Sequence, residues 1–168
     1  MTKVRFMDLA TRQELTLDLP KSKSEILKID RDFFEKEWDV VDWEGKFIES
    51  GMVASEINRM CQAHEDNLHI PDELLLAIYQ DCGDDVFDND RMSELIVLNS
   101  SGENDYAGVA DEFSEQGIIV NLDDHPLSNY LNREAIGRDI ILGSSVISSS
   151  AGTGIFPENI RIPKELLA

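Results

Sequence analysis

The sequence predicts an α+β protein, an elongated chain of two or three small modules. Residues 3–19 alternate between apolar and polar side chains, which is typical of a β-hairpin. Apolar residues between positions 53 and 79 then recur at helical spacing. Near the end of the chain, two short β-prone segments flank a glycine-containing turn. We therefore expect an N-terminal small antiparallel sheet with a helix, a helical middle, and C-terminal helices with a short antiparallel sheet.

The first module is expected to span residues 1–48. Its hairpin should turn near residues 11–13. Ser22 and Glu25 have the spacing of a capping box, so a short helix should follow the hairpin. That helix is expected to bury Ile26, Leu27 and Ile29. The segment 38–43 is rich in aromatic and β-branched residues and predicts a third strand.

The second module, residues 49–98, should be mainly helical and acidic. Its first helix is expected to bury one face made of Val53, Ile57, Met60 and Cys61. Pro71 suits the first position of the next helix, and Gly83 suits its end. The buried face of that second helix should comprise Leu74, Leu75, Ile78 and Tyr79. Residues 95–98 fit either an extended segment or the end of a helix, and periodicity does not decide between them.

The third module, residues 99–168, should combine helices with a short sheet. Asn104 suits the cap of a helix that ends at Gly117. Pro126 suits the start of another helix, with an apolar face of Leu127, Tyr130 and Leu131. The last two strands and the turn between them are expected at residues 145–149, 155–156 and 151–154.

The net charge of −19 is concentrated in the middle of the chain. Residues 1–29 contain 4 acidic and 6 basic residues, residues 30–124 contain 26 and 5, and residues 125–168 contain 4 of each. The middle segment therefore has a net charge of −21, about the charge of 36 Å of duplex DNA at one charge per roughly 1.7 Å. A salt-adapted protein would instead spread its acidic residues over the whole surface. This charge repels nucleic acid and anionic membranes, so we expect neither as a partner.

Cysteine content and the N-terminal sequence indicate a reducing compartment. Cys61 and Cys82 are too few for a disulfide framework. The first residues contain no apolar run of signal-peptide length, and no segment approaches the length of a membrane span. We expect a cytoplasmic protein of bacterial type.

Several short motifs occur in a fixed order in the last third of the chain. Asn104-Asp105-Tyr106 begins the expected helix, and Leu127-Ser128-Asn129-Tyr130-Leu131 follows it. Next come Ala135-Ile136-Gly137-Arg138-Asp139, a short apolar segment expected to be a strand, and Gly154-Ile155-Phe156. This order resembles that of the antirestriction ArdA proteins, in which a Gly-Arg-Asp triplet leads into a strand and a terminal Gly-Ile-Phe.

The resemblance covers roughly residues 38–157. Val41-Asp42-Trp43-Glu44, followed by the helix containing Glu56-Ile57-Asn58, is similar to a domain junction of that family. Two departures stand out: Ile136 replaces a usual aromatic residue, and residues 8–12 lack the Tyr-Asn-Gly and Gly-Trp signature near the N-terminus.

The resemblance implies a function. ArdA proteins are dimers that resemble bent B-form DNA and occupy the DNA groove of type I restriction–modification enzymes, which protects mobile genetic elements. By this resemblance, the chain is not an enzyme, forms a homodimer, and binds the methyltransferase core of a type I complex.

A DNA mimic must hold its carboxylates on rigid elements, because ordering flexible side chains would cost affinity. The acidic residues of the middle segment lie on or next to predicted helices and strands, on the sides that do not supply the core. The predicted DNA-mimic surface comprises Asp30, Asp32, Glu35, Glu37, Asp39, Asp72, Glu73, Asp81, Asp84, Asp85, Asp88, Asp90, Asp105, Asp111, Glu112 and Glu115. Many of these residues individually also fit an ordinary solvated face, so no single one should be indispensable.

The neutral last third is the natural place for a contact between two copies, because two segments of −21 repel each other. We expect this contact to involve Leu127, Tyr130, Leu131 and Ile136, with Arg133 or Arg138 pairing with a carboxylate. A place in the core is the alternative for these apolar residues, and it is expected for at least half of them.

Other kinds of site fit the sequence poorly. Loops starting at Asp81 or Asp84 lack the glycine and the glutamate of an EF-hand. A zinc site would need Cys61, His64, His69 and Cys82, and Cys82 has no nearby partner. The serine-rich segments lack a nucleophile elbow, and Gly152-Thr153-Gly154 lacks the lysine of a phosphate-binding loop. We expect no catalytic residue, no metal and no cofactor.

A second functional class remains open. An acidic adaptor or regulator would bind a basic protein without imitating a duplex. Displacement of DNA from the target separates the two classes, since only a mimic competes with DNA. A small metal-dependent enzyme is a remote third alternative, which metal analysis would address.

Overall fold

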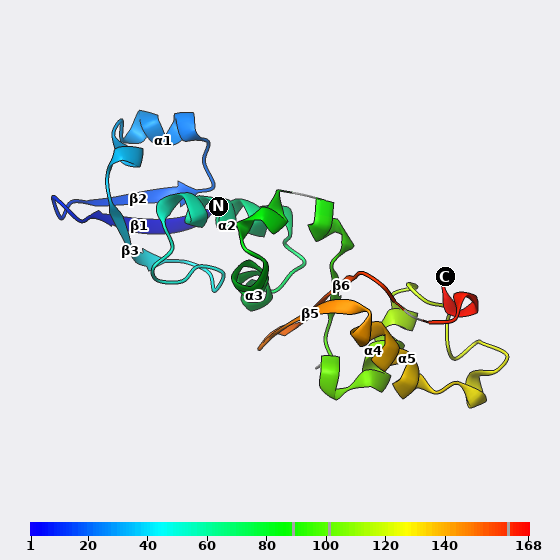
Figure 1. The fold of residues 1–168 in the computed structure, drawn as a ribbon. Helices are drawn as coiled ribbons and strands as arrows, with labels where there is room; N and C mark the ends of the chain where they lie inside the picture. Colours follow the sequence, from blue (N-terminus) through cyan, green and yellow to red (C-terminus); the bar gives the residue numbers. More distant parts are fainter. Residues whose placement is uncertain (89, 101, 161) are drawn as a thin grey trace. The chain divides into compact units, whose positions relative to one another are not determined.

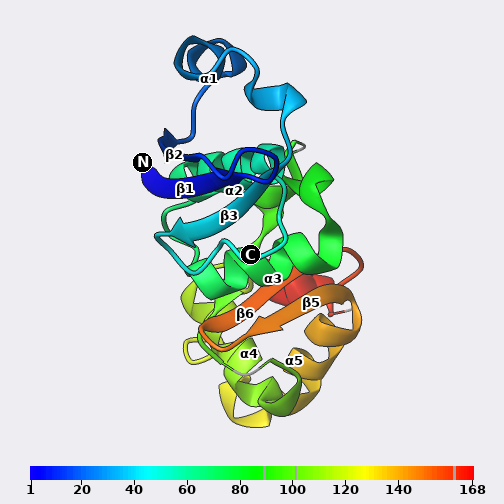
Figure 2. The same cartoon turned by 90° about the vertical axis from the view of Figure 1, so that its left-hand side faces the viewer.

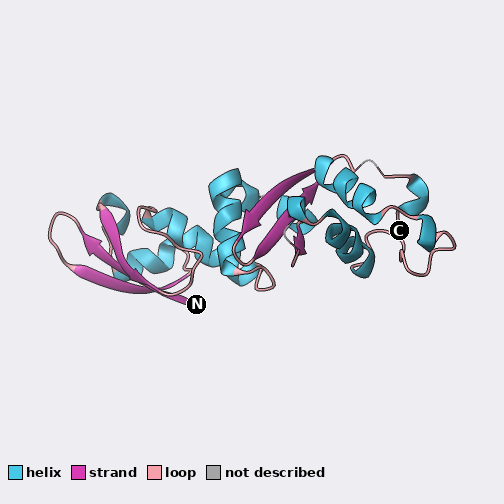
Figure 3. Cartoon of the chain, turned by 90° about the horizontal axis from the view of Figure 1, so that it is seen from below, coloured by secondary structure: helices cyan, strands magenta, loops and turns pink. Residues whose placement is uncertain are grey.

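The computed structural model describes residues 1–88, 90–100, 102–160 and 162–168 (Figure 1). It confirms the α+β class, with helices and a three-stranded antiparallel sheet in each of two compact units, Met1–Leu76 and Ala77–Ala168. Figure 3 draws the strands of the two sheets in magenta. The finer division into three modules stays a prediction. Among the described residues there is no helix whose length and apolar character would let it cross a membrane.

The sheet of the first unit confirms the predicted hairpin and third strand. It contains β1 (Thr2–Asp8), β2 (Glu14–Leu19) and β3 (Trp38–Trp43) in the order β2-β1-β3, with both pairs antiparallel. Val4 lies opposite Leu17, and both side chains are buried. The alternation seen in the sequence therefore separates an apolar inner face from a charged outer face.

A bulge in β3 changes that alternation. Phe6 pairs with Val40 and Arg5 pairs with Asp42, so Val41 is an extra residue on the β3 side. Asp39, opposite Met7, and Asp42, opposite Arg5, consequently share the outer face although they are three residues apart. Both are exposed.

Helix α1 (Lys23–Ile29) begins at the predicted capping box. The Ser22 hydroxyl accepts a hydrogen bond from the Glu25 amide at 3.3 Å, and the Glu25 carboxylate accepts one from the Ser22 amide at 2.8 Å. Ile26 is buried as predicted. The prediction for Ile29 was wrong: it is 50% exposed, because it lies in the last turn of a helix of only seven residues.

Helices α2 (Ala54–Asp66) and α3 (Asp72–Cys82) form where the sequence predicted helices. Figure 2 shows α2 behind the first sheet, and its buried residues include Ile57, Met60 and Cys61. The prediction that Val53 belongs to this buried face was wrong, because Val53 precedes the helix and is 54% exposed. Gly83 ends α3 with a positive φ of 75°, which favours glycine. The 3-10 helices η2 (Asp84–Phe87) and η3 (Asp90–Glu94) follow.

The sheet of the second unit contains β4 (Ile96–Leu98), β5 (Ser144–Ser149) and β6 (Gly152–Pro157) in the order β4-β6-β5. Residues 96–98 are thus a strand, which the sequence left undecided. The predicted β5–β6 hairpin forms, but its turn lies at residues 150–151. The prediction of a turn at 151–154 was wrong, since Gly152 and Gly154 belong to β6 and pair with Ser149 and Ile147.

The helices of the second unit differ from the prediction at their starts. Helix α4 (Tyr106–Glu115) is capped by Asp105, whose carboxylate accepts the Gly108 amide at 2.9 Å. The predicted cap, Asn104, instead ends the 3-10 helix η4 (Gly102–Asn104). Gly117, with φ of 72°, follows the end of α4 as predicted.

The predicted helix at Pro126 is only a 3-10 turn, η5 (Ser128–Tyr130). Helix α5 (Arg133–Leu142) begins after it, with Asn132 as its cap. The apolar residues 140–142, expected as a strand, are the last turn of α5. A terminal 3-10 helix, η6 (Lys164–Leu166), completes the unit, and the core lies mainly among α4, α5 and the sheet.

Candidate functional site

None of the sixteen carboxylates of the predicted DNA-mimic surface is buried, and they fall into two groups. We call the exposed group the anionic surface; it comprises Asp32, Glu35, Glu37, Asp39, Asp81, Asp85, Asp88, Asp90, Asp105 and Glu115. We call the partly buried group the partnered carboxylates; it comprises Asp30, Asp72, Glu73, Asp84, Asp111 and Glu112. The side chains of the first group are more exposed to solvent than those of the second, although members of both groups contact their own chain, as Asp105 does at the start of α4.

In the first unit, an aromatic cluster holds the segment that carries Glu35, Glu37 and Asp39. The Phe33 and Trp38 rings stack with centroids 5.0 Å apart, and the Trp38 indole N–H donates to the Phe33 carbonyl at 2.7 Å. The backbone between these two residues includes most of η1 (Phe33–Glu35) and is therefore fixed at both ends. The carboxylates point to solvent from a constrained backbone, as an interaction surface requires.

Two partnered carboxylates of the first unit neutralise lysines. Asp30 lies 2.5 Å from the Lys36 ammonium, and this hydrogen bond raises the pKa of Lys36. Glu73 lies 2.7 Å from the Lys46 ammonium, which lowers the pKa of Glu73 and raises that of Lys46. Each pair is close to neutral, so these two carboxylates contribute less to the negative charge of the surface than unpaired carboxylates would.

Asp72 connects three segments of the first unit. One of its oxygens accepts the Lys46 amide at 2.9 Å, and the other lies 3.2 Å from His64 Nε2. The His64 ring stacks on Phe47 with centroids 4.3 Å apart. Asp72 is therefore a structural residue at the start of α3, and only part of its side chain faces solvent.

In the second unit, Glu112 and Asp111 on α4 are also structural. The Glu112 carboxylate accepts the amides of Asn99 and Ser100 at 2.7 and 2.6 Å, which ties α4 to the end of β4. Arg133, at the start of α5, is bonded to both Asp111 and Asp123. The two carboxylates raise the pKa of Arg133.

The end of α3 and the segment after it carry four members of the anionic surface: Asp81, Asp85, Asp88 and Asp90. Val86, in η2, is 3% exposed and attaches this segment to the protein interior. Arg91 lies over the Phe156 ring at 4.8 Å and 3.1 Å from Glu158, which anchors the start of η3 to β6 and the residue after it. The carboxylates therefore project from an anchored segment.

Sequence reasoning missed several exposed acidic residues, of which Asp42 and Asp123 are examples. The Asp42 side chain is 69% exposed and shares the outer face with Asp39, which only the bulge at Val41 reveals. The Asp123 side chain is 80% exposed in a turn where the Asn121 side chain accepts the Asp123 amide at 3.0 Å. The Asn-Leu-Asp-Asp sequence there is a turn signal that could have identified it.

Both units are acidic. The first contains 17 acidic and 10 basic residues, a net charge of −7, and the second contains 17 and 5, a net charge of −12. The second unit thus has more net negative charge even though it includes the neutral last third of the sequence.

The residues predicted to contact a second copy separate into surface and core. Leu127 is 56% exposed and Tyr130 is 87% exposed, at and beside the turn η5. Leu131 is partly buried against the core, and Ile136 is 7% exposed and belongs to the core. Leu127 and Tyr130 are therefore the apolar residues of this set that are accessible to a partner.

The Gly137-Arg138-Asp139 motif lies in the middle of α5. Gly137 is buried, whereas the Arg138 side chain is 57% exposed. Its guanidinium lies 3.9 Å from Asp139, the next residue along the helix. Arg138 is thus far less constrained than Arg133 of the same helix.

The cysteine and histidine side chains considered for zinc do not form a common group. In the ranges that the structure describes, no three His, Cys, Asp or Glu side chains are arranged to hold a metal ion. Cys61 is fully buried, and this burial raises the pKa of its thiol to about 12. The Cys61 thiol is therefore protonated at neutral pH and a poor metal ligand or nucleophile.

Comparison with known proteins adds no relative. A scan against models of protein families found no match to this chain, and a search of the curated proteins found none either.

Proposed function

We propose that the chain is an antirestriction protein of the ArdA type, which offers carboxylates in place of DNA phosphates to a type I restriction–modification complex. The observation that carries this proposal is the anionic surface itself. Ten carboxylates face solvent from helices, strands and short anchored segments, and both units contribute to them.

Such a surface suits a target that binds DNA through lysine and arginine. These enzymes draw their sequence-independent affinity from cations facing phosphates. Carboxylates on a fixed backbone lose less conformational entropy on binding than carboxylates on a flexible segment, which favours competition with a rigid duplex. The protein would occupy the DNA groove of the methyltransferase core and protect a mobile element in the cytoplasm.

The partnered carboxylates would contribute less to binding than the anionic surface. Asp30, Glu73 and Asp111 already neutralise a lysine or an arginine of their own chain. A cation of the target would have to compete with those contacts. Greater exposure to solvent, and not the absence of a partner, therefore ranks the ten residues of the anionic surface above the other six.

We further propose a homodimer whose contact includes Leu127 and Tyr130. Both are exposed apolar side chains in the neutral part of the sequence. A contact there would keep the acidic segments of two copies apart, because like charges repel.

A competition experiment tests the function. A fluorescent duplex bound to the purified methyltransferase core of a type I system is titrated with the protein, and anisotropy reports the bound duplex. We expect displacement that weakens as salt increases, because both partners bind by charge. Binding to the core without displacement of the duplex would contradict mimicry and support the adaptor.

A further inference from the structure

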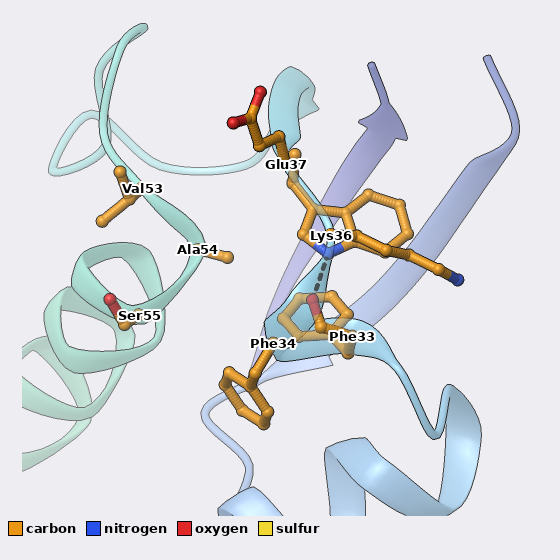
Figure 4. Close-up of a pocket in the computed structure, with 8 residues that line it drawn as sticks. Phe33, Phe34, Lys36, Glu37, Val53, Ala54 and Ser55 are labelled. Carbon is orange, nitrogen blue, oxygen red and sulfur yellow. Dashed lines mark hydrogen bonds between the residues drawn. The ribbon is translucent and has the colours of Figure 1, made fainter. Parts of the chain in front are cut away.

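An apolar pocket of about 280 Å³ lies in the first unit beside the anionic surface (Figure 4). It lies between the segment of η1 and the start of α2. Its apolar and small lining residues are Phe33, Phe34, Trp38, Val53, Ala54 and Ser55. Lys36 and Glu37 complete the lining. Figure 4 shows residues 53–55 on one side of the pocket and Phe33 and Phe34 on the other.

Two large apolar side chains at this pocket remain exposed to solvent. Phe34 is 43% exposed and Val53 is 54% exposed. The Phe34 ring contacts Phe33 edge-on at 5.2 Å, so it is held in place and still presents apolar surface. Covering these two side chains with another apolar group would be favourable, since removal of apolar surface from water stabilises contacts.

The rim of the pocket is predominantly anionic. Glu37 lines it, Glu35 directly follows Phe34, and both are exposed. In the part of the chain that the structure describes, neither carboxylate forms an ion pair within 4 Å. The Glu56 carboxylate accepts the Val53 amide at 2.9 Å and adds a third negative charge beside the pocket.

Two lysines lie near the pocket. The Lys36 ammonium is bonded to Asp30 at 2.5 Å, and Figure 4 shows it directed away from Val53 and Ala54. The Lys23 ammonium lies 5.4 Å from the centre of the Phe34 ring. Glu37 is thus the carboxylate that lines the pocket, Glu35 and Glu56 lie next to lining residues in the sequence or by a hydrogen bond, and Lys36 is already paired with Asp30.

We propose that this pocket receives one large apolar side chain, such as phenylalanine or leucine, from a lysine- or arginine-rich segment of the target protein. The volume is below the roughly 300–1,000 Å³ of pockets for drug-sized ligands, so it suits a single side chain. The carboxylates of the rim select cationic neighbours for that side chain. Buried apolar anchors surrounded by polar contacts carry much of the energy of protein interfaces.

This inference rests on the proposed function, because it assumes a cationic protein partner. It adds a property that duplex DNA lacks. Charge contacts weaken with salt, whereas a buried apolar anchor does not. The pocket would therefore retain part of the affinity at high salt.

The test uses short peptides and the full chain with Trp43→Phe, which leaves Trp38 of the pocket as the only tryptophan. Trp38 fluorescence is followed during titration with the acetylated, amidated peptides Lys-Lys-Phe-Lys-Lys, Lys-Lys-Ala-Lys-Lys and Glu-Glu-Phe-Glu-Glu. We expect the first peptide to bind about tenfold or more tightly than the second, as burial of one phenylalanine predicts. The third should not bind.

Two variants locate the binding. Phe34→Ala should remove the preference for the phenylalanine peptide, because it removes a wall of the pocket. Leu68→Ala is the matched control, since Leu68 is 74% exposed and is not among the residues that line the pocket. Thermal unfolding of both variants verifies that they fold. A preference that survives Phe34→Ala would overturn the proposal.

The outcomes separate this inference from the proposed function. Equal binding of the lysine peptides with phenylalanine and alanine, or no binding of either, would refute the pocket while duplex displacement could still succeed. Selective binding of the phenylalanine peptide without duplex displacement would refute the mimic and leave the pocket as the anchor for a different cationic protein.

Discussion

A Cβ atom on Gly137 would lie 1.7 Å from the carbonyl oxygen of Tyr106, so α4 and α5 meet at a point with no room for a side chain. The neighbour is backbone at the start of α4, which cannot rotate away as a side chain can. The glycine of the Gly-Arg-Asp motif thus has a packing role that follows from the structure alone.

We expect Gly137→Ala to lower the free energy of unfolding by about 2 kcal/mol or more. Alanine favours helix by about 1 kcal/mol over glycine, but overpacking against a backbone oxygen outweighs this gain. Urea denaturation provides the measurement. Glu134→Ala, at an exposed position of the same helix, is the control and should change stability by less than about 0.5 kcal/mol. Equal stability of Gly137→Ala and the unmodified protein would contradict the packing.

Arg133 and Arg138 lie on the same helix, α5, but differ in their contacts. Arg133 is bonded to two carboxylates, whereas Arg138 lies 3.9 Å from one. We expect Arg133→Leu to lose about 1 kcal/mol of stability and Arg138→Leu to lose almost none. Urea denaturation at low and high salt would measure both. The loss in Arg133→Leu should shrink at high salt, and a loss of similar size in both variants would argue against the bridging role.

Asp8 predicts a pH dependence of stability. The Thr11 hydroxyl and the Ala10 amide donate to its carboxylate at 2.8 and 2.9 Å, and these bonds lower the pKa of Asp8 below its ordinary 3.8. A lowered folded-state pKa stabilises the protein above the ordinary pKa, and this contribution disappears as pH falls through the folded-state value. The difference in unfolding free energy between the unmodified protein and Asp8→Asn should be constant above about pH 5 and shrink below 3.8. Urea denaturation of both proteins across this pH range is the measurement. A difference in unfolding free energy that does not change with pH would refute the stabilising role of the Asp8 carboxylate.

The anionic surface and the partnered carboxylates should respond differently to neutralisation. If the proposed function is correct, the triple variant Glu35→Gln, Glu37→Gln, Asp39→Asn should displace duplex DNA roughly tenfold less well, at about 0.5 kcal/mol per carboxylate. Its thermal midpoint should not fall. Glu112→Gln should instead lose about 1 kcal/mol of stability, because two amides lose a charged acceptor, and should still displace DNA. The reverse pattern would invalidate the division into two groups.

A substitution at Tyr130 can distinguish an effect on self-association from an effect on folding. It is 87% exposed, so Tyr130→Glu should leave the thermal midpoint unchanged. If the proposed dimer contact is correct, the added charge should weaken dimerisation at least about tenfold, as loss of an interface anchor does. Sedimentation velocity at several concentrations measures this. Ile136→Glu is the contrasting variant and should unfold the protein, because Ile136 belongs to the core.

Local signals in the sequence predicted the elements well where one interaction determines them. The Ser22–Glu25 capping box is such a case, since both hydrogen bonds form within four residues. The start of α4 was predicted one residue early because Asn104 and Asp105 are both good caps. Asn104 belongs to the 3-10 helix η4, so Asp105 is the residue left to cap α4.

Helix α5 was missed because its sequence gives a misleading local signal. Gly137 in its centre disfavours helix, and the apolar residues 140–142 resemble a strand. Packing against α4 overrides both tendencies, and that contact joins segments about thirty residues apart. No local pattern contains that information.

The candidate site was predictable as a composition but not as a set of contacts. The sequence identified carboxylates on structured elements, and none of them is buried. The sequence could not identify Lys36 as the partner of Asp30. Nor could it show that the Asn99 and Ser100 amides donate to the Glu112 carboxylate. Those pairings depend on turns and packing that bring the groups together.

The strand order β2-β1-β3 places carboxylates along both free edges of the first sheet. Glu14 and Asp18 lie on β2, and Asp39 and Asp42 lie on β3. A second molecule that added a strand at either edge would bring like charges into opposition, which natural sheets use to avoid aggregation. The acidity on which the proposed function depends thus also disfavours fibre-like growth through the edges of this sheet.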